Sequence, residues 1–263
     1  MKKLVLLLFI TSFSVVFSQN QKLTPLKIDS IRFDGDAFLG YDSFGFYYTI
    51  KNNVFSKISK LDTLEYKNIS LGKITKVDLQ NPLKIVLFYE NFNTVIVLDN
   101  QLNETQKINF SENTIPILAT AIGIASQNQL WVYNTMNQQL GLYDYLNNDY
   151  KTISVPFTEN IKHYSSDFNV FHWVDNKNNW YLCDIFGKIK SKGIIPDFDS
   201  IVIINENQFI YSKDAVLILY DLGKVKKTEI EISEKTFKKF YYKDQILSIF
   251  TSAGITNYKI TIP

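Results

Sequence analysis

A short sequence ending recurs along this chain, and its spacing constrains the fold more than any other feature. Five segments end in an apolar or aromatic residue followed by aspartate, and these aspartates are Asp62, Asp99, Asp144, Asp184 and Asp221. The steps between successive aspartates are 37, 45, 40 and 37 residues. A period of this length indicates an array of similar supersecondary units rather than one irregular domain.

Each unit reads as a series of short β-strands. Residues 74–110 contain four apolar or alternating segments in a row, separated by turns that carry asparagine and aspartate. Both residue types tolerate the backbone of tight hairpins. The pattern divides the chain into units at residues 37–71, 74–110, 114–157, 158–196, 197–232 and from 233 onward. The third unit is the longest, and we expect its extra residues in a loop before Ala119.

The sixth unit lacks a fourth strand of its own. A step of 37 places its aspartate near residue 258, where the sequence has Tyr258 and then ends within five residues. At the other end of the chain, residues 26–33 alternate apolar and polar side chains, which predicts a spare strand. We expect this strand to complete the sixth sheet, because that pairing removes an open sheet edge.

Four-stranded units of about 40 residues, joined by short turns, resemble the blades of a β-propeller. The ending Tyr220-Asp221-Leu222-Gly223-Lys224 is similar to the third strand and turn of many propeller repeats. The resemblance is to an architecture, since the sequence has neither a Gly-His…Trp-Asp pair nor a kelch double glycine. We therefore predict an all-β, six-bladed β-propeller over residues 19–263, closed by the N-terminal strand. A seven-bladed ring, a β-sandwich pair and a β-solenoid are the alternatives.

Residues 1–18 have the three parts of a secretory signal peptide. Met1-Lys2-Lys3 is a positive region, residues 4–16 are apolar, and Ser18 precedes a predicted cut at Gln19. The apolar run is too short to span a bilayer, and no longer one follows. We expect a periplasmic or secreted protein with no membrane span in the mature chain. Cys183 is the single cysteine, so an internal disulfide is excluded and we expect a buried thiol.

Charge and motif content exclude several kinds of site. The chain has 28 basic and 26 acidic residues, a formal net charge of +2, which gives no basic footprint for nucleic acid. The two histidines, His163 and His172, lack the spacing of a metal site. His163 lies in the first strand of its unit, and such strands line a propeller channel. We predict no metal, no cofactor and no catalytic residue, because no nucleophile motif or phosphate loop is present.

The loops between the second and third strands of the units are expected to share one face of the ring. These loops are residues 51–53, 90–93, 134–138, 175–179, 212–214 and 251–254. Aromatic and amide groups on one rigid surface are typical of protein or glycan recognition. The predicted binding residues are Phe92, Asn93, Asn137, Asn178 and Trp180. The alternative is that asparagine occurs there because hairpins favour it.

Two functions follow from this pattern. The first is an exported, non-enzymatic propeller that binds an envelope protein, a glycan or another ligand. The second is a carbohydrate-active enzyme, a lyase or a glycosidase, with its site at the channel. Two nearby carboxylates, or a buried histidine with charged neighbours, would favour the enzyme, whereas an aliphatic plug would exclude it. A small-ligand sensor is a third possibility without a signature. The recurring aspartates are predicted to satisfy turn backbone.

Overall fold

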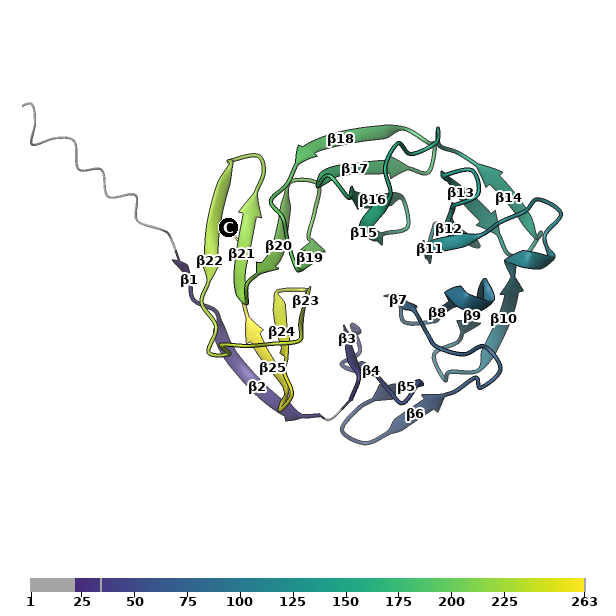
Figure 1. Cartoon of the computed structure of the whole chain (residues 1–263). Helices are drawn as coiled ribbons and strands as arrows, with labels where there is room; N and C mark the ends of the chain where they lie inside the picture. Colours follow the sequence, from purple (N-terminus) through teal and green to yellow (C-terminus); the bar gives the residue numbers. More distant parts are fainter. Residues whose placement is uncertain (1–21, 34, 263) are drawn as a thin grey trace, which may run out of the picture.

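The computed structural model describes residues 22–33 and 35–262. Six sheets, antiparallel apart from one short added strand, are arranged around a central axis (Figure 1). The prediction of an all-β, six-bladed propeller is therefore confirmed, and the sandwich, solenoid and seven-bladed alternatives are excluded. The predicted signal peptide, residues 1–18, lies outside the described residues.

The innermost strand of each blade comes first in the chain, except that the N-terminal strands join the last two blades. Blade 1 contains β3 (Ala37–Tyr41), β4 (Tyr47–Lys51), β5 (Val54–Ile58) and β6 (Thr63–Tyr66). Blade 2 contains β7 (Lys76–Asn81), β8 (Lys84–Tyr89), β9 (Thr94–Leu98) and β10 (Glu104–Asn109). Blade 3 contains β11 (Ala119–Ile124), β12 (Gln129–Asn134), β13 (Gln139–Asp144) and β14 (Asp149–Thr152). Blade 4 contains β15 (Ile161–Ser166), β16 (Val170–Asp175), β17 (Asn179–Asp184) and β18 (Ile189–Ile194). Blade 5 contains β19 (Ser200–Ile203), β20 (Gln208–Lys213), β21 (Val216–Asp221) and β22 (Lys226–Ile230). Blade 6 contains β23 (Lys239–Lys243), β24 (Ile246–Phe250) and β25 (Gly254–Lys259). Two 3₁₀ turns, η1 (Glu90–Phe92) and η2 (Phe110–Glu112), lie in blade 2 and after it.

The start of the chain supplies outer strands to two blades. β2 (Leu26–Arg32) pairs antiparallel with β25, from Leu26 opposite Lys259 to Arg32 opposite Gly254. β1 (Lys22–Leu23) pairs in parallel with β22, so it adds a fifth strand to blade 5. The sequence pattern did not predict β1, because a two-residue strand shows no periodicity. The two pairings hold the beginning of the chain against its end (Figure 1).

The second and third strands of the blades form much of the interior. All five residues of β9 are buried, and so are five of the six residues of β8. Adjacent blades cover both faces of these strands, and strands covered on both faces lose the alternation of apolar and polar residues. The outer strand β10 is largely exposed and polar. This difference explains why the middle of each sequence unit reads as a continuous apolar run.

Because neighbouring strands are antiparallel, the turns between second and third strands share one face with the connections between blades. We call this face A, and its turns are residues 52–53, 90–93, 135–138, 176–178, 214–215 and 251–253. The first strand of every blade begins at face A. The connection 110–118, which includes η2, has nine residues, as many as the connection 67–75 that enters blade 2, so the expected longer loop before Ala119 is wrong. Part of the extra length lies in the loop 125–128, which has four residues where the equivalent loop 82–83 has two.

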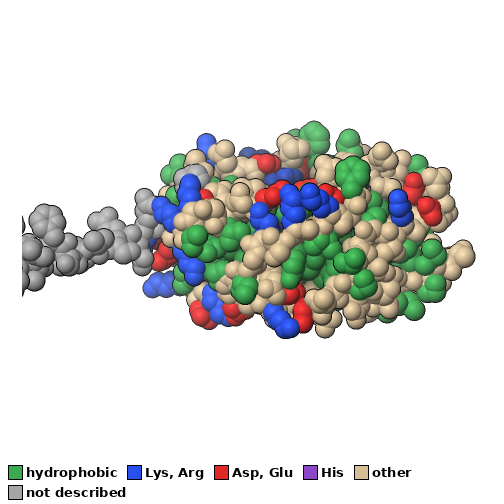
Figure 2. All heavy atoms as spheres, turned by 90° about the horizontal axis from the view of Figure 1, so that it is seen from above, with side chains coloured by type: hydrophobic (Ala, Val, Ile, Leu, Met, Phe, Trp, Pro, Cys, Tyr) green, Lys and Arg blue, Asp and Glu red, His purple; other side chains and the backbone are tan. Residues whose placement is uncertain are grey.

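Figure 2 shows the molecule edge-on as a flattened disc, with acidic and basic side chains intermixed along the visible wall. This side therefore carries no broad patch of a single charge. Within residues 22–33 and 35–262, no helix has the length and apolar character needed to cross a membrane.

Candidate functional site

Four of the recurring aspartates lie in turns and bond the turn backbone. Asp184 accepts hydrogen bonds from the backbone N–H groups of Phe186 and Lys188, both at 3.0 Å. Asp99, Asp144 and Asp221 accept backbone N–H groups in the same type of turn. These carboxylates satisfy groups that the strands leave unpaired. The predicted structural role of the four residues is confirmed.

Blade 1 differs, and the assignment of Asp62 to the repeat was wrong. In blades 2 to 5 the recurring aspartate lies five residues after the first residue of the third strand, and in blade 1 that position is Ser59. The Ser59 hydroxyl accepts the N–H groups of Leu61 and Asp62, at 3.2 and 3.0 Å. Leu61-Asp62 has the same residue types as the other endings but lies at a different position in its hairpin.

Asn93, a predicted binding residue, holds blade 2 to the connection that enters blade 3. Its backbone has a φ of 48°, and its side chain is buried. The side-chain amide donates to the Ile117 carbonyl at 2.7 Å and accepts the Ala119 N–H at 3.0 Å. Asn53 makes the equivalent pair of contacts, with Gly72 and Ile74, one blade earlier. Asparagine at this position therefore has a structural role, as the alternative interpretation predicted.

The two predicted aromatic residues lie in different surroundings. Phe92 ends η1 on face A, and 49% of its surface is exposed. Trp180 is fully buried between blades 4 and 5, where its ring meets Phe209 edge to face at 5.6 Å. The expectation that Trp180 stands on the surface of the rim is corrected, because its side chain points to the face of β17 that blade 5 covers. Phe92 alone keeps an aromatic surface available at this rim position.

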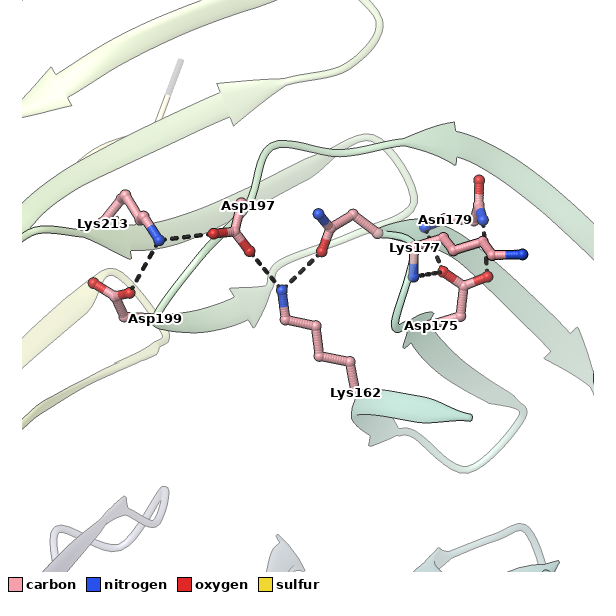
Figure 3. Close-up of polar contacts among 8 residues, drawn as sticks. Lys162, Asp175, Lys177, Asn179, Asp197, Asp199 and Lys213 are labelled. Atoms are coloured by element: carbon pink, nitrogen blue, oxygen red, sulfur yellow. Dashed lines mark hydrogen bonds and ion pairs between the residues drawn. The ribbon is translucent and has the colours of Figure 1, made fainter. Parts of the chain in front are cut away.

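The remaining two predicted residues, Asn137 and Asn178, lie on blades 3 and 4. Asn137 is exposed, and its side-chain oxygen accepts the Gln139 N–H at 3.2 Å. Asn178 accepts a hydrogen bond from Lys162 at 2.8 Å, and Lys162 pairs with Asp197 at 2.7 Å. Figure 3 shows how this chain of contacts continues from Asp197 to Lys213 and Asp199. The two lysines lower the pKa of Asp197, and the network links blades 4 and 5.

A cavity opens at the mouth of the central channel on face A. Its volume is about 730 Å³, and its walls come from blades 1, 2 and 6. A second cavity of about 340 Å³ shares Leu39, Lys76, Val77 and Tyr241 with the first and extends to β15 of blade 4. The two cavities therefore adjoin along the inner strands. Their walls combine aliphatic, aromatic and charged side chains.

The charged side chains around these two cavities are mostly lysines. They are Lys73, Lys76, Lys239 and Lys243, with Asp36 and Asp78 as the acidic residues. Burial lowers the pKa of Lys76, which Asp78 raises and Lys239 lowers further. Burial also lowers the pKa of Lys239. Lys76 and Lys239 thus come from different blades, and their like charges repel one another. Lys76 is half-buried, whereas Lys239 is exposed at the cavity mouth.

Asp78 compensates part of this positive charge, because its carboxylate raises the pKa of Lys76. Its carboxylate accepts the backbone N–H groups of Gln80 at 2.9 Å and of Ile124, in blade 3, at 2.8 Å. Burial raises the pKa of Asp78, and the two backbone hydrogen bonds act in the opposite direction. The carboxylate is therefore used to join two inner strands.

Tyr241 lines both cavities, and His163 lies in β15, whose later residues Ser165 and Ser166 line the second one. Burial, together with the charges of Lys76 and Lys239, lowers the pKa of His163 to about 3. The imidazole ring meets the Phe198 ring edge to face, with 6.1 Å between the ring centres. The Tyr241 ring packs on Gly40, where a Cβ atom would lie 2.3 Å from the ring. Burial raises the pKa of Tyr241 to about 12.

The other two residues singled out in the sequence lie away from the channel. His172 is buried, with its ring 6.0 Å from that of Trp180, and burial lowers its pKa. Cys183 is buried as expected, and burial raises its pKa to about 12, so the thiol is not activated. In the described part of the chain, no three His, Cys, Asp or Glu side chains gather in a way that could hold a metal ion.

Sequence reasoning missed the channel lysines, although a signal for them was present. Polar residues recur at every second position of two inner strands, as Lys76, Asp78 and Gln80 in β7 and as Lys239, Tyr241 and Lys243 in β23. Alternate residues of a strand share one face. For the innermost strand of a blade, the polar set marks the channel side.

Comparisons with known proteins establish the fold and no family. No family model and no curated protein matches the chain. Virginiamycin B lyase from Staphylococcus aureus matches with a TM-score of 0.58 at 13% identity, covering 85% of this chain and 80% of the lyase. A DUF4221 family member from Bacteroides vulgatus matches with a TM-score of 0.58 at 9% identity, covering 93% of this chain and 97% of that one. The extracellular domain of a putative one-component system from B. thetaiotaomicron matches with a TM-score of 0.51 at 12% identity, covering 90% of this chain and 40% of that one.

Proposed function

We propose that this propeller is an exported, non-enzymatic module of the cell envelope that binds a small ligand at the channel mouth on face A. The observation that carries the proposal is the cavity of about 730 Å³ formed by three blades. Its size is within the range of small-molecule sites, and its wall combines apolar, aromatic and charged side chains. Export is supported by the signal-peptide pattern of residues 1–18.

The titratable groups of the channel favour binding over proton transfer. An efficient general acid or base has a pKa near the working pH. The pKa of His163 is lowered to about 3, and that of Tyr241 is raised to about 12. At neutral pH the imidazole is therefore a weak base and the phenol a weak acid. Both groups suit hydrogen bonding to a ligand better than catalysis.

The rim of face A supports a protein or glycan partner less well than the channel supports a ligand. Asn93 and Trp180 are committed to the interior, and Asn178 is engaged by Lys162. Phe92 and Asn137 are the two exposed members of the predicted set, and they lie on different blades. They provide additional contacts for an envelope protein or glycan that also enters the channel.

Native mass spectrometry of the protein isolated with its bound small molecules tests the proposal. Leu39 lines both cavities, so Leu39→Trp narrows the channel. Met136 is 64% exposed on face A away from these cavities, so Met136→Trp is the matched control. We expect wild type and Met136→Trp to retain a ligand that Leu39→Trp loses. Retention of the same ligand by a folded Leu39→Trp variant would contradict a channel site.

A lyase is the second candidate, and His163 is the observation that favours it. It lies in the innermost strand of blade 4, and the charges of Lys76 and Lys239 help to lower its pKa. The likeness to virginiamycin B lyase concerns the fold alone. Incubation with uronic-acid polysaccharides, followed by the ultraviolet absorbance of unsaturated products, tests this candidate. Product formation by wild type that His163→Gln abolishes would establish catalysis and replace the binding proposal.

A further inference from the structure

We propose that the ligand of the channel is a small anion with at least two negative charges, carried by carboxylate or phosphate groups and held by Lys76 and Lys239. The proposal rests on the proposed function, because it uses the same cavity. It adds the chemical class of the ligand and the residues that select it.

The first argument is the charge balance of the cavity walls. Four lysines face two aspartates, which leaves a formal excess of two positive charges. Both aspartates already accept backbone hydrogen bonds, Asp36 from Asn52 at 2.7 Å and Asp78 from Gln80 and Ile124. A concave site with protein walls concentrates the field of such an excess and attracts counter-ions. A ligand with two negative charges would restore neutrality.

The second argument is that the lysines have no partner of their own. Within residues 22–33 and 35–262, the ammonium groups of Lys76, Lys239 and Lys243 have neither an ion pair nor a hydrogen bond. The single polar contact of Lys76 is with the face of the Tyr164 ring, 4.5 Å from the ring centre. A cation–π contact attracts the ammonium group but does not neutralise its charge, and Asp78 is the one nearby carboxylate whose charge acts on Lys76. Buried ammonium groups are normally paired, and for the half-buried Lys76 the ligand is the partner that we propose.

The contrast with Lys162 and Lys213 sharpens this point. Those lysines also lie near face A, and each pairs with Asp197 at 2.7 Å (Figure 3). The chain therefore does supply carboxylates to lysines on this face where the lysines have a structural role. Lys76, which is half-buried, and Lys239, which is exposed at the cavity mouth, form no ion pair of this kind.

The third argument concerns the shape of the ligand. Lys76 and Lys239 start the inner strands of blades 2 and 6, at the face A end of the channel. The Tyr241 ring, fixed against Gly40, lines the same cavity. A ring offers an apolar surface to a sugar or another compact carbon skeleton. Lysines act as point charges and bind both carboxylate and phosphate groups. The experiment below therefore distinguishes a carboxylate ligand from a phosphate ligand.

Isothermal titration calorimetry of the protein from cells that express the full chain tests the inference. The probes are inorganic phosphate, glucose 6-phosphate with glucose as its neutral counterpart, and digalacturonate with neutral digalactose. We expect at least one anion to bind at least about tenfold more tightly than its neutral counterpart. Lys76→Met and Lys239→Met should each lower the affinity for that anion by about tenfold or more. Lys151 is exposed on the outer strand β14, so Lys151→Met is the control, and it should change the affinity by less than about twofold.

The outcomes separate this inference from the proposed function. Three results would each overturn the proposal of an anionic ligand. They are equal binding of the neutral counterpart, unchanged affinity in the folded Lys76→Met and Lys239→Met variants, and no binding of any anion. A neutral ligand that Leu39→Trp loses would overturn this inference and leave the channel site standing. An anion that the folded Leu39→Trp variant binds as tightly as wild type would overturn both.

Discussion

The turns of the blades and the central channel use polar side chains in opposite ways. In the turns, the side chains of Asp184 and Asn93 form hydrogen bonds with the backbone of their own blade or of the connection to the next. In the channel, the ammonium groups of Lys76 and Lys239 have no hydrogen bond or ion pair within the described residues. The first group of residues builds the ring, and the second leaves bonding capacity for a ligand.

The comparison shows that residue type alone does not identify a site in a repeat protein. Asparagine and tryptophan are frequent in recognition surfaces, yet Asn93 and Trp180 serve the packing of this propeller. A repeated position is more informative, because a residue that recurs once per blade answers a need of every blade. A polar residue that departs from the repeat and faces the axis is the better candidate for function.

The largest effect should come from Trp180, whose place in the interior sets it apart from the exposed Phe92. We expect Trp180→Ala to lower the free energy of unfolding by about 3–5 kcal/mol, because it leaves a cavity between two blades. Phe92→Ala should cost less than about 1 kcal/mol. Urea denaturation followed by fluorescence and circular dichroism measures both. Similar costs for the two variants would contradict the assignment of Trp180 to the interior.

Asn93 should give the next largest effect. Asn93→Ala leaves the Ala119 N–H and the Ile117 carbonyl without their partner and keeps a left-handed backbone at an alanine. A cost of about 2–3 kcal/mol is expected. Asn137→Ala is the matched control, since that side chain is exposed and accepts one turn N–H. Thermal unfolding of the two variants side by side makes the measurement, and a stable Asn93→Ala protein would sink the structural interpretation.

His163 predicts how acid affects the channel. Its folded pKa of about 3 lies below the ordinary value of 6.5, so between these values the unfolded chain binds the proton and the folded chain does not. Stability from this group is therefore full above pH 6.5 and is lost as the pH falls toward 3. Relative to wild type, His163→Gln should gain about 2.5 kcal/mol of stability between pH 7 and pH 4.5. Urea titrations at both pH values test this, and an equal difference at both would contradict it.

The smallest effects should come from the turns. Asp184→Ala should lower the free energy of unfolding by about 1 kcal/mol. The effect is small because the two backbone N–H groups that lose their partner lie at the surface and can donate to water. If Ser59 holds the same position in blade 1, Ser59→Asp should change stability by less than about 0.5 kcal/mol. Asp62→Asn provides the contrast, as its carboxylate accepts the N–H of Thr63 alone among the described contacts. A large loss in Ser59→Asp would show that the turn of blade 1 is not equivalent to the others.

The sequence predicted the blades well because their signals are local and repeated. Alternation in Leu26–Arg32 and the missing fourth strand of the last unit were enough to place β2 beside β25. The short strand β1 has two residues and pairs with β22 near the other end of the chain, so Lys22 and Leu23 show no local pattern that predicts a strand. Asp62 was misassigned because Leu61-Asp62 resembles the other repeat endings in residue type. Its distance from the start of the third strand differs from theirs.

The candidate site was harder to predict, because it is built from residues that the fold brings together. Lys76 and Lys239 are far apart in the chain and meet at the axis of the ring. Each looks like an ordinary exposed lysine of an alternating strand until the innermost strand of its blade is known. Whether Trp180 faced the surface or the blade interface depended in the same way on which side of β17 the next blade covers.

Anomalous diffraction from crystals soaked in bromide tests the central claim most directly, because bromide reports anion sites without any assumption about the natural ligand. We predict a strong peak inside the channel mouth, between the side chains of Lys76 and Lys239 and close to the Tyr241 ring. Bromide that appears at outer-wall lysines such as Lys151 and leaves the channel empty would contradict the account.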